Sequence, residues 1–264
     1  KELYGLYGNV NETGGNIIID EKFKKRFKSI IHVYFDKGIS CSFKANIRQH
    51  GDFLDHIQLS GGNLFQSLDV SLKTGHINGI TKFKLLIPKT RYYPEDEIIL
   101  TELLREFGFI APRTAFVEVK LNNRISTMLF QEKAEKEMLE YHARREGPMF
   151  EGDERYIVKL NLENRLTSKA VEFLLAKQTN PNWAIKDMQF QNISHLALTK
   201  LNGIYLNVID QRQYNGLYNF THFNFDNNSL AMGNQNQILE WDVYYAIMFS
   251  TSYGHGMSSH NRKF

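Results

Sequence analysis

Apolar and polar residues alternate in short segments along the first half of the chain. Residues 67–72 read SLDVSL and residues 81–87 read TKFKLLI, and glycine-containing turns lie beside them. A period of two is typical of a strand that buries one face. Because the connections between the segments are short, we expect the strands to pair in an antiparallel sheet.

Two further pairs of segments predict β-hairpins. In each pair the segments flank residues suited to a tight turn, DKG at residues 36–38 and NN at residues 122–123. Asparagine tolerates the positive φ that a two-residue hairpin turn needs. The predicted hairpins join residues 30–35 to 40–47 and residues 114–121 to 125–130.

Helical spacing occurs once in the first half and dominates the second. The segment PEDEIILTELLREFG begins with proline and acidic residues, which suit the first turn of a helix, and ends at Gly108. Ile99, Leu103 and Phe107 recur at intervals of four and predict its apolar face. Further helices are predicted at residues 132–145, 168–177, 193–209 and 239–250.

These patterns predict an α+β fold with two lobes. Residues 1–131 are expected to form a β-rich N-terminal lobe with one helix, and residues 132–264 a mostly helical C-terminal lobe. The chain starts on Lys1 and stops on Phe264 in what has the pattern of a strand. We therefore expect both ends to be cut from a longer protein and the second lobe to be incomplete.

Composition narrows the classes of protein. A net charge of +3 is too small to predict a nucleic-acid partner, and the single cysteine, Cys41, excludes an internal disulfide framework. No apolar run has the length of about 18 residues that a membrane span needs. The common motifs of phosphate loops, dinucleotide sites, serine hydrolases and zinc proteases are absent. The compartment stays open, and export or attachment to a bacterial cell surface fits the sequence.

Lys84 is the strongest candidate for a ligand-binding residue. A lysine on a strand binds phosphate as a point charge, and an acid on a neighbouring helix can orient it. Glu102 is the first candidate for that acid and Glu106 the second. Upstream, Gly51 would let backbone N–H groups approach a phosphate that Arg48 contacts through two hydrogen bonds. Ordinary solvated surface charges explain the same residues equally simply.

Two other clusters have a weaker chemical interpretation. The sequence HGDFLDH carries possible metal ligands, but its spacing matches no specific metal site, so a polar loop is the preferred interpretation. The acids Glu151 and Asp153 would suit a two-carboxylate glycan hydrolase, yet acids on a glycine-containing loop are more often solvated. The possible metal ligands are His50, Asp52, Asp55 and His56.

Taken in order, these stretches resemble the CotH (spore-coat protein H) kinase family, a family of atypical protein-kinase-like proteins. The resemblance begins near Arg48 and runs to the end of the chain. It is most specific at LLREFGFIAPRTAFVEVKLNNRISTMLFQEK, where a helix leads into a strand, an asparagine turn and a strand ending in glutamate. Residues 48–51 resemble the Arg-x-Gly element of the family with one extra residue. Residues 260–261 (HN) resemble the end of its catalytic loop.

The resemblance implies a two-lobed, protein-kinase-like fold. It also implies that the chain binds ATP with Mg²⁺ and transfers a phosphoryl group to a protein or another hydroxyl acceptor, such as a glycan. It also implies a role for each matching residue. Lys84 would hold the α- and β-phosphates, with Arg48 and Gly51 above them. Glu102 would partner Lys84. The remaining implied roles are an adenine-side position for Glu132 and a metal ligand for Asn261.

The resemblance fails at one position with chemical consequences. A kinase catalytic loop carries aspartate about five residues before its asparagine, whereas this chain has Gly256 there, beside His255. Histidine can act as a general base near neutral pH, so His255 becomes the predicted base. The same departure favours an alternative, a pseudokinase-like binding or coat-assembly protein. The second metal-binding aspartate is expected beyond Phe264.

Overall fold

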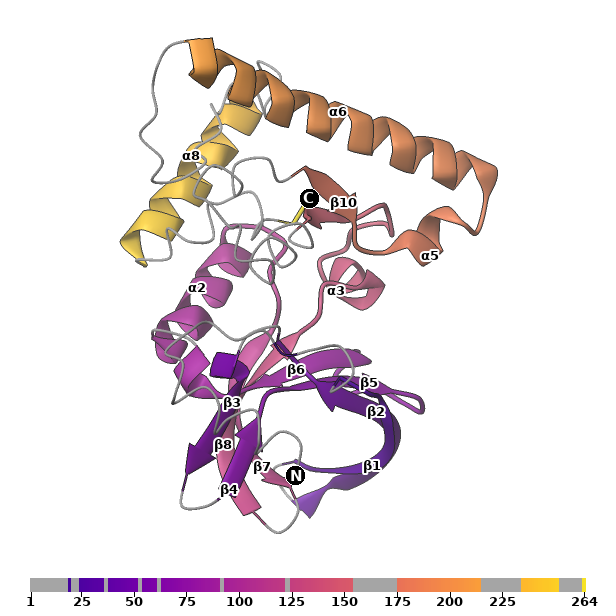
Figure 1. The fold of residues 1–264 in the computed structure, drawn as a ribbon, viewed down its shortest axis with the longest axis vertical. Coiled ribbons are helices and arrows are strands. Elements are labelled where there is room, and N and C mark those ends of the chain that lie inside the picture. The colour runs from indigo at the N-terminus through magenta and orange to yellow at the C-terminus, as the bar shows by residue number, and fades with distance from the viewer. Residues whose placement is uncertain are drawn as a thin grey trace. The chain divides into compact units, whose positions relative to one another are not determined.

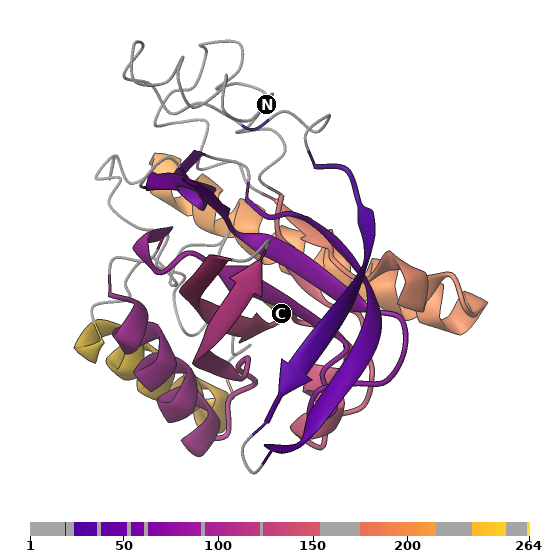
Figure 2. The same cartoon turned by 90° about the horizontal axis from the view of Figure 1, so that it is seen from below.

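The computed structural model divides the chain into two compact units, Lys1–Arg145 and Glu146–Phe264, and each is described by itself. Sequence patterns suggested a boundary near residue 131. Figures 1 and 2 show the fold in two views. The structure describes residues 19, 24–35, 38–51, 54–60, 63–90, 93–121, 124–153, 175–214, 234–251 and 263–264.

A six-stranded antiparallel sheet forms the N-terminal unit. Its strand order is β1-β2-β5-β6-β8-β7, and β1 and β2 bend strongly across one end of it (Figure 1). Both predicted hairpins are confirmed, since β1 pairs with β2 and β7 with β8. The strands are β1 (Phe27–Tyr34), β2 (Ser40–Gln49), β5 (Leu68–Leu72), β6 (Lys82–Leu86), β7 (Thr114–Leu121) and β8 (Arg124–Glu132).

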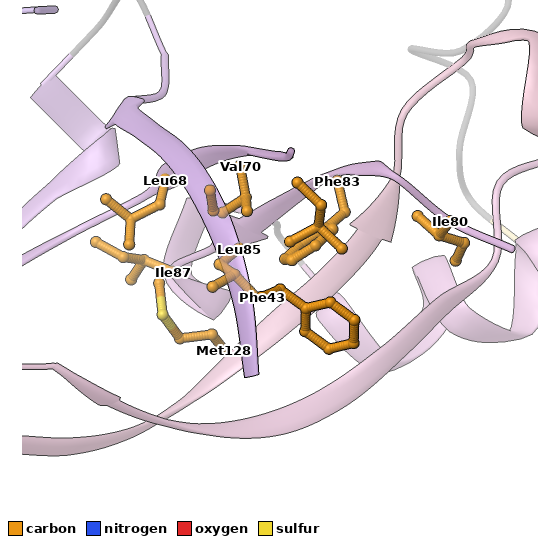
Figure 3. Close-up of a cluster of buried hydrophobic side chains, with 10 residues drawn as sticks. Phe43, Leu68, Val70, Ile80, Phe83, Leu85, Ile87 and Met128 are labelled. Atoms are coloured by element: carbon orange, nitrogen blue, oxygen red, sulfur yellow. The ribbon is translucent and has the colours of Figure 1, made fainter. Parts of the chain in front are cut away.

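The core of this unit lies against one face of the sheet. Alternation along β5 and β6 sends Val70 and Phe83 into the core (Figure 3) and sends their sequence neighbours to the opposite face. Phe83 also packs against Phe130, with ring centroids 4.7 Å apart. The buried members of this core are Phe43, Ala45, Leu68, Val70, Leu72, Ile80, Phe83, Leu85, Ile87 and Met128.

Helix α2 (Pro94–Glu106) connects β6 to β7. It begins at the predicted proline, and Gly108 follows its end with a φ of +81°. The predicted apolar face is wrong, because Ile99 and Phe107 are exposed. The side that is buried instead carries Glu97, Leu100 and Thr101, so an acid lies on the packed side of this helix.

The other elements of this unit are short. The helix predicted at residues 132–145 is confirmed only as α3 (Lys136–Tyr141), because β8 continues to Glu132. A small hairpin, β3 with β4, lies between β2 and β5 in the sequence. The remaining short elements are the 3₁₀ turns η3 (Leu54–His56) and η4 (Pro88–Thr90) and the strands β3 (Ile57–Ser60) and β4 (Asn63–Gln66).

The C-terminal unit is mostly helical where it is described. Its core contains Phe150, Ala176, Leu201 and Tyr205. The helix predicted at residues 168–177 is wrong at its end, since β10 pairs there with β9. None of the helices in the described ranges has the length and apolarity to cross a membrane. The elements are β9 (Phe150–Gly152), β10 (Ala176–Gln178), α5 (Pro181–Ala184), α6 (Met188–Tyr214) and α8 (Gln235–Ser250).

Candidate functional site

A row of polar side chains crosses the sheet on the face opposite the core. Strand register places Arg48 beside Asp69, Asp69 beside Lys84 and Lys84 beside Gln131. Directly opposed residues in an antiparallel sheet have Cβ atoms about 5 Å apart and point to the same side. Arg48, Asp69, Lys84 and Gln131, here called the polar row, therefore form one continuous strip over β2, β5, β6 and β8.

Asp69 is the charged centre of the polar row. Its Oδ2 atom accepts hydrogen bonds from Arg48 Nε at 3.3 Å and Nη2 at 3.2 Å, and from Lys133 Nζ at 3.1 Å. The aspartate side chain is only 3% exposed, against 32% for Arg48 and 25% for Lys133. Hydrogen bonds between charged groups are stronger than neutral ones, so the two cations are held firmly.

Lys133 reaches Asp69 from the far side of Lys84. It directly follows β8, and its backbone N–H donates to the carbonyl of Lys82 on β6 at 3.1 Å. Its side chain then extends across β6 to Asp69 on β5, and β6 is the strand that carries Lys84. Arg48 on β2, Lys84 on β6 and Lys133 just after β8 thus lie around one carboxylate.

The helix acid beside the polar row is Glu97. Glu97 is buried and accepts a hydrogen bond from Nε2 of Gln131, the register neighbour of Lys84. Glu102 lies five residues later, about 140° around the helix, where it is exposed and pairs with Arg105. Glu106 is exposed as well. The structure therefore places Glu97, rather than either predicted acid, on the side of α2 that faces the polar row.

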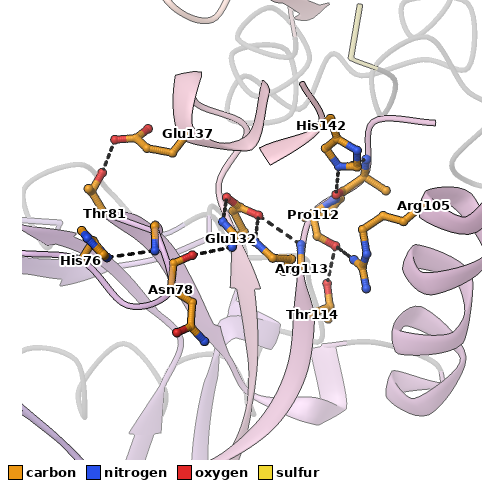
Figure 4. Close-up of polar contacts among 12 residues, drawn as sticks. His76, Asn78, Thr81, Arg105, Pro112, Arg113, Thr114, Glu132, Glu137 and His142 are labelled. Carbon is orange, nitrogen blue, oxygen red and sulfur yellow. Dashed lines mark hydrogen bonds and ion pairs between the residues drawn. The ribbon is translucent and has the colours of Figure 1, made fainter. Parts of the chain in front are cut away.

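Glu132 is occupied by a buried ion pair with Arg113 (Figure 4). Two parallel hydrogen bonds join them, Arg113 Nε to Oε2 at 2.8 Å and Nη2 to Oε1 at 2.7 Å. The glutamate side chain is 1% exposed and the arginine side chain 18%. The hydrogen bonds to Glu132 raise the pKa of Arg113, against the opposing effect of burial. The carboxylate predicted for the adenine side thus acts within the N-terminal unit as a structural group.

Gly51 is required by a neighbouring side chain. Its φ is +92°, and a Cβ atom built on it would lie 1.9 Å from Cδ2 of His56. The His56 ring in turn packs edge-on against His50, with ring centroids 5.0 Å apart. A phosphate is therefore not needed to explain the glycine. Among the described residues no group of three or more His, Cys, Asp or Glu could hold a metal ion, and Asp52 lies outside them.

Of the remaining residues that the sequence predicted, two lie outside the part of the chain that the structure describes and two lie within it. His255 and Asn261 lie outside the described residues. The two acids of the hydrolase interpretation are neutralised by lysines, since Lys177 Nζ lies 3.8 Å from Glu151 and 3.5 Å from Asp153. Glu151 also pairs with Lys263. These ion pairs favour a structural role for both acids.

A pocket of about 230 Å³ lies elsewhere in the N-terminal unit, and its lining contains no member of the polar row. Apolar side chains make up much of its wall, with one arginine among them. Among the described residues of the N-terminal unit, this pocket and the polar row therefore do not coincide. The lining includes Leu64, Phe65, Pro88, Leu121, Arg124 and Met128.

Sequence reasoning missed Asp69, Lys133, Glu97 and Gln131. One signal for Asp69 was available, because it stands at the polar position of an alternating strand, and all five residues of β5 are buried. A charged residue on a central strand needs a partner. Its partner Lys133 follows 64 positions later, which no local pattern reveals.

A scan against models of protein families found no matching family, and a search of curated proteins found no match.

Proposed function

We propose that this chain is a CotH-like atypical kinase, which binds ATP with Mg²⁺ and transfers the γ-phosphoryl group to a hydroxyl of a protein or another acceptor. One observation carries the proposal. Lys84 lies on β6, a central strand of the antiparallel sheet, and the next helix presents a buried acid, Glu97, to Gln131 beside it. Protein kinases bind nucleotide phosphates with a strand lysine, which a glutamate of the following helix orients.

The polar row fits the phosphates of such a ligand. Phosphoryl transfer is catalysed chiefly by positioning the reactants and neutralising charge. Lys84 would contact the α- and β-phosphates. Glu97 would hold Gln131, the register neighbour of Lys84, in place. Asp69 already binds two cations, so it is not the metal ligand. The proposed ligand for Mg²⁺ is Asn261, and bound Mg²⁺ neutralises phosphate charge.

Gly256 favours a second function, in which the chain binds the nucleotide but transfers nothing. The base is then missing unless the neighbouring His255 replaces it. Such a pseudokinase-like protein would serve binding or surface assembly. Replacing His255 by alanine abolishes transfer, with nucleotide binding retained, if histidine is the base.

The test is nucleotide binding by the whole chain, measured by calorimetry with ATP and Mg²⁺. Lys84→Met is expected to weaken binding at least about tenfold, which corresponds to one charge-assisted hydrogen bond of about 1.5 kcal/mol. Lys120→Met is the matched control, because Lys120 is an exposed lysine on β7 of the same sheet. Absence of binding, or equal binding by both variants, would overturn the proposal.

Transfer is then assayed with labelled ATP and candidate protein and glycan acceptors. Labelled acceptor supports the kinase. Intact, Lys84-dependent binding without label on any acceptor selects the pseudokinase-like function instead.

A further inference from the structure

The ion pairs at Asp69 are arranged with the acid inside and the cations outside. Only 3% of the aspartate side chain is exposed, whereas Arg48 and Lys133 keep a quarter to a third of their side chains in contact with solvent. Both cations converge on the same oxygen, Oδ2. The donors that Asp69 leaves unused on these two side chains are therefore available to a ligand at the surface.

Positive charge exceeds negative charge around this carboxylate. Arg48, Lys84 and Lys133 carry three positive charges, and Asp69 and Glu97 carry two negative charges. A local excess of positive charge beside a partly buried surface concentrates anions. Arg48 and Lys133 meet at Oδ2 of Asp69, and Lys84 is the register neighbour of Asp69 on the next strand, so the three cations gather around one carboxylate.

We infer that Lys133 is a further phosphate-binding residue and that Asp69 is the positioning residue that holds Lys133 and Arg48 together beside Lys84. The inference rests on the proposed nucleotide site and extends it to a preference for ligands with several phosphates. A single phosphate brings about two negative charges to these three cations, whereas a triphosphate brings more negative charge and more acceptor oxygens. The charge of the phosphates, rather than the base, then supplies most of the binding.

The probes are inorganic tripolyphosphate, inorganic phosphate and adenosine, each titrated into the whole chain. The unmodified protein is expected to bind tripolyphosphate far more tightly than inorganic phosphate. Lys133→Gln should weaken tripolyphosphate binding by about 10- to 100-fold, the usual loss for one hydrogen bond to a charged group. Adenosine binding should be unchanged, and Lys133→Arg should restore most of the lost affinity.

Lys82→Gln is the matched control. Lys82 lies on the same strand as Lys84 and pairs with Glu135 at 2.9 Å instead of with Asp69. Its replacement also removes one ion-paired lysine from the sheet, and we expect less than a threefold effect on tripolyphosphate. Comparable losses in Lys82→Gln and Lys133→Gln would overturn the role of Lys133.

The variant Asp69→Asn distinguishes two effects of Asp69: positioning of Arg48 and Lys133, and electrostatic repulsion of an anionic ligand. Removing a negative charge from an anion site should tighten anion binding if Asp69 only repels the ligand. Weaker tripolyphosphate binding with unchanged adenosine binding is expected if Asp69 positions the two cations, and tighter binding would refute this. Binding that depends on Lys84 but not on Lys133 overturns the inference alone, whereas indifference to Lys84 overturns the proposed function.

Discussion

Replacing Arg113 by methionine is expected to destabilise the N-terminal unit more than any surface substitution. The change removes both hydrogen bonds to the buried Glu132 carboxylate. It also removes the 2.5 Å hydrogen bond to the carbonyl of Asn78 and the contact with the Tyr141 ring, whose centroid lies 4.2 Å from Arg113 Cζ. Glu132 would keep only a 3.3 Å hydrogen bond from the Arg113 backbone N–H.

The expected loss in unfolding free energy is about 3–5 kcal/mol, the range for removing one partner of a buried ion pair. Most of it comes from the charge left buried, since Glu132 is 1% exposed. Arg113→Lys should recover only part of the loss, because lysine cannot make the two parallel hydrogen bonds. The more exposed pair of Lys82 and Glu135 is the comparison, and Lys82→Met should cost at most about 1 kcal/mol.

Urea denaturation followed by circular dichroism measures these differences. A double variant, Arg113→Met with Glu132→Leu, supplies the sharper test because it removes both charges. It should be more stable than Arg113→Met alone, since no uncompensated charge remains. A double variant less stable than the single one, or a loss below about 1 kcal/mol for Arg113→Met, would refute the assignment of the pair as a buried structural clamp.

Two further substitutions test the geometry near the polar row. Gly51→Ala is expected to lower the unfolding free energy by at least about 1–3 kcal/mol, because its Cβ would meet the His56 ring, whereas Gly38→Ala incurs the φ strain alone, with no atom within 4 Å. Equal losses of stability in Gly51→Ala and Gly38→Ala, measured by thermal denaturation, would contradict the role of His56. Glu97→Gln should weaken ATP binding several-fold and Glu102→Gln should not, since only Glu97 contacts Gln131; calorimetry that ranks them in the opposite order would reject Glu97.

Local patterns predicted the strands and hairpins because each depends on residues close in sequence. Alternation in SLDVSL and TKFKLLI located β5 and β6, and the pairing of β7 with β8 followed from the asparagine turn. The order of the strands did not follow from the pattern. Since β8 inserts between β6 and β7, the residue beside Lys84 is Gln131, which a strictly consecutive sheet would have placed on a more distant strand.

The acid on α2 could not be predicted for a related reason. Apolar spacing selected Ile99, Leu103 and Phe107 as the packed face, but the helix buries the side that carries Glu97. A buried carboxylate is unfavourable until a donor reaches it, and the donor is Gln131, 34 positions later in the chain. The spacing of apolar residues in one segment depends on that segment alone, so it cannot reveal a hydrogen-bond partner on a distant strand.

Two buried acids of the N-terminal unit differ in a way that separates stability from binding. Glu132 meets an arginine whose other groups contact Asn78 and Tyr141, so the charges of that pair are satisfied inside the unit. Asp69 meets two cations that remain partly exposed. A buried ion pair contributes little net stability compared with apolar packing. The stability of the fold therefore explains poorly why a buried aspartate binds two partly exposed cations. An anionic ligand that needs both cations in place explains it better.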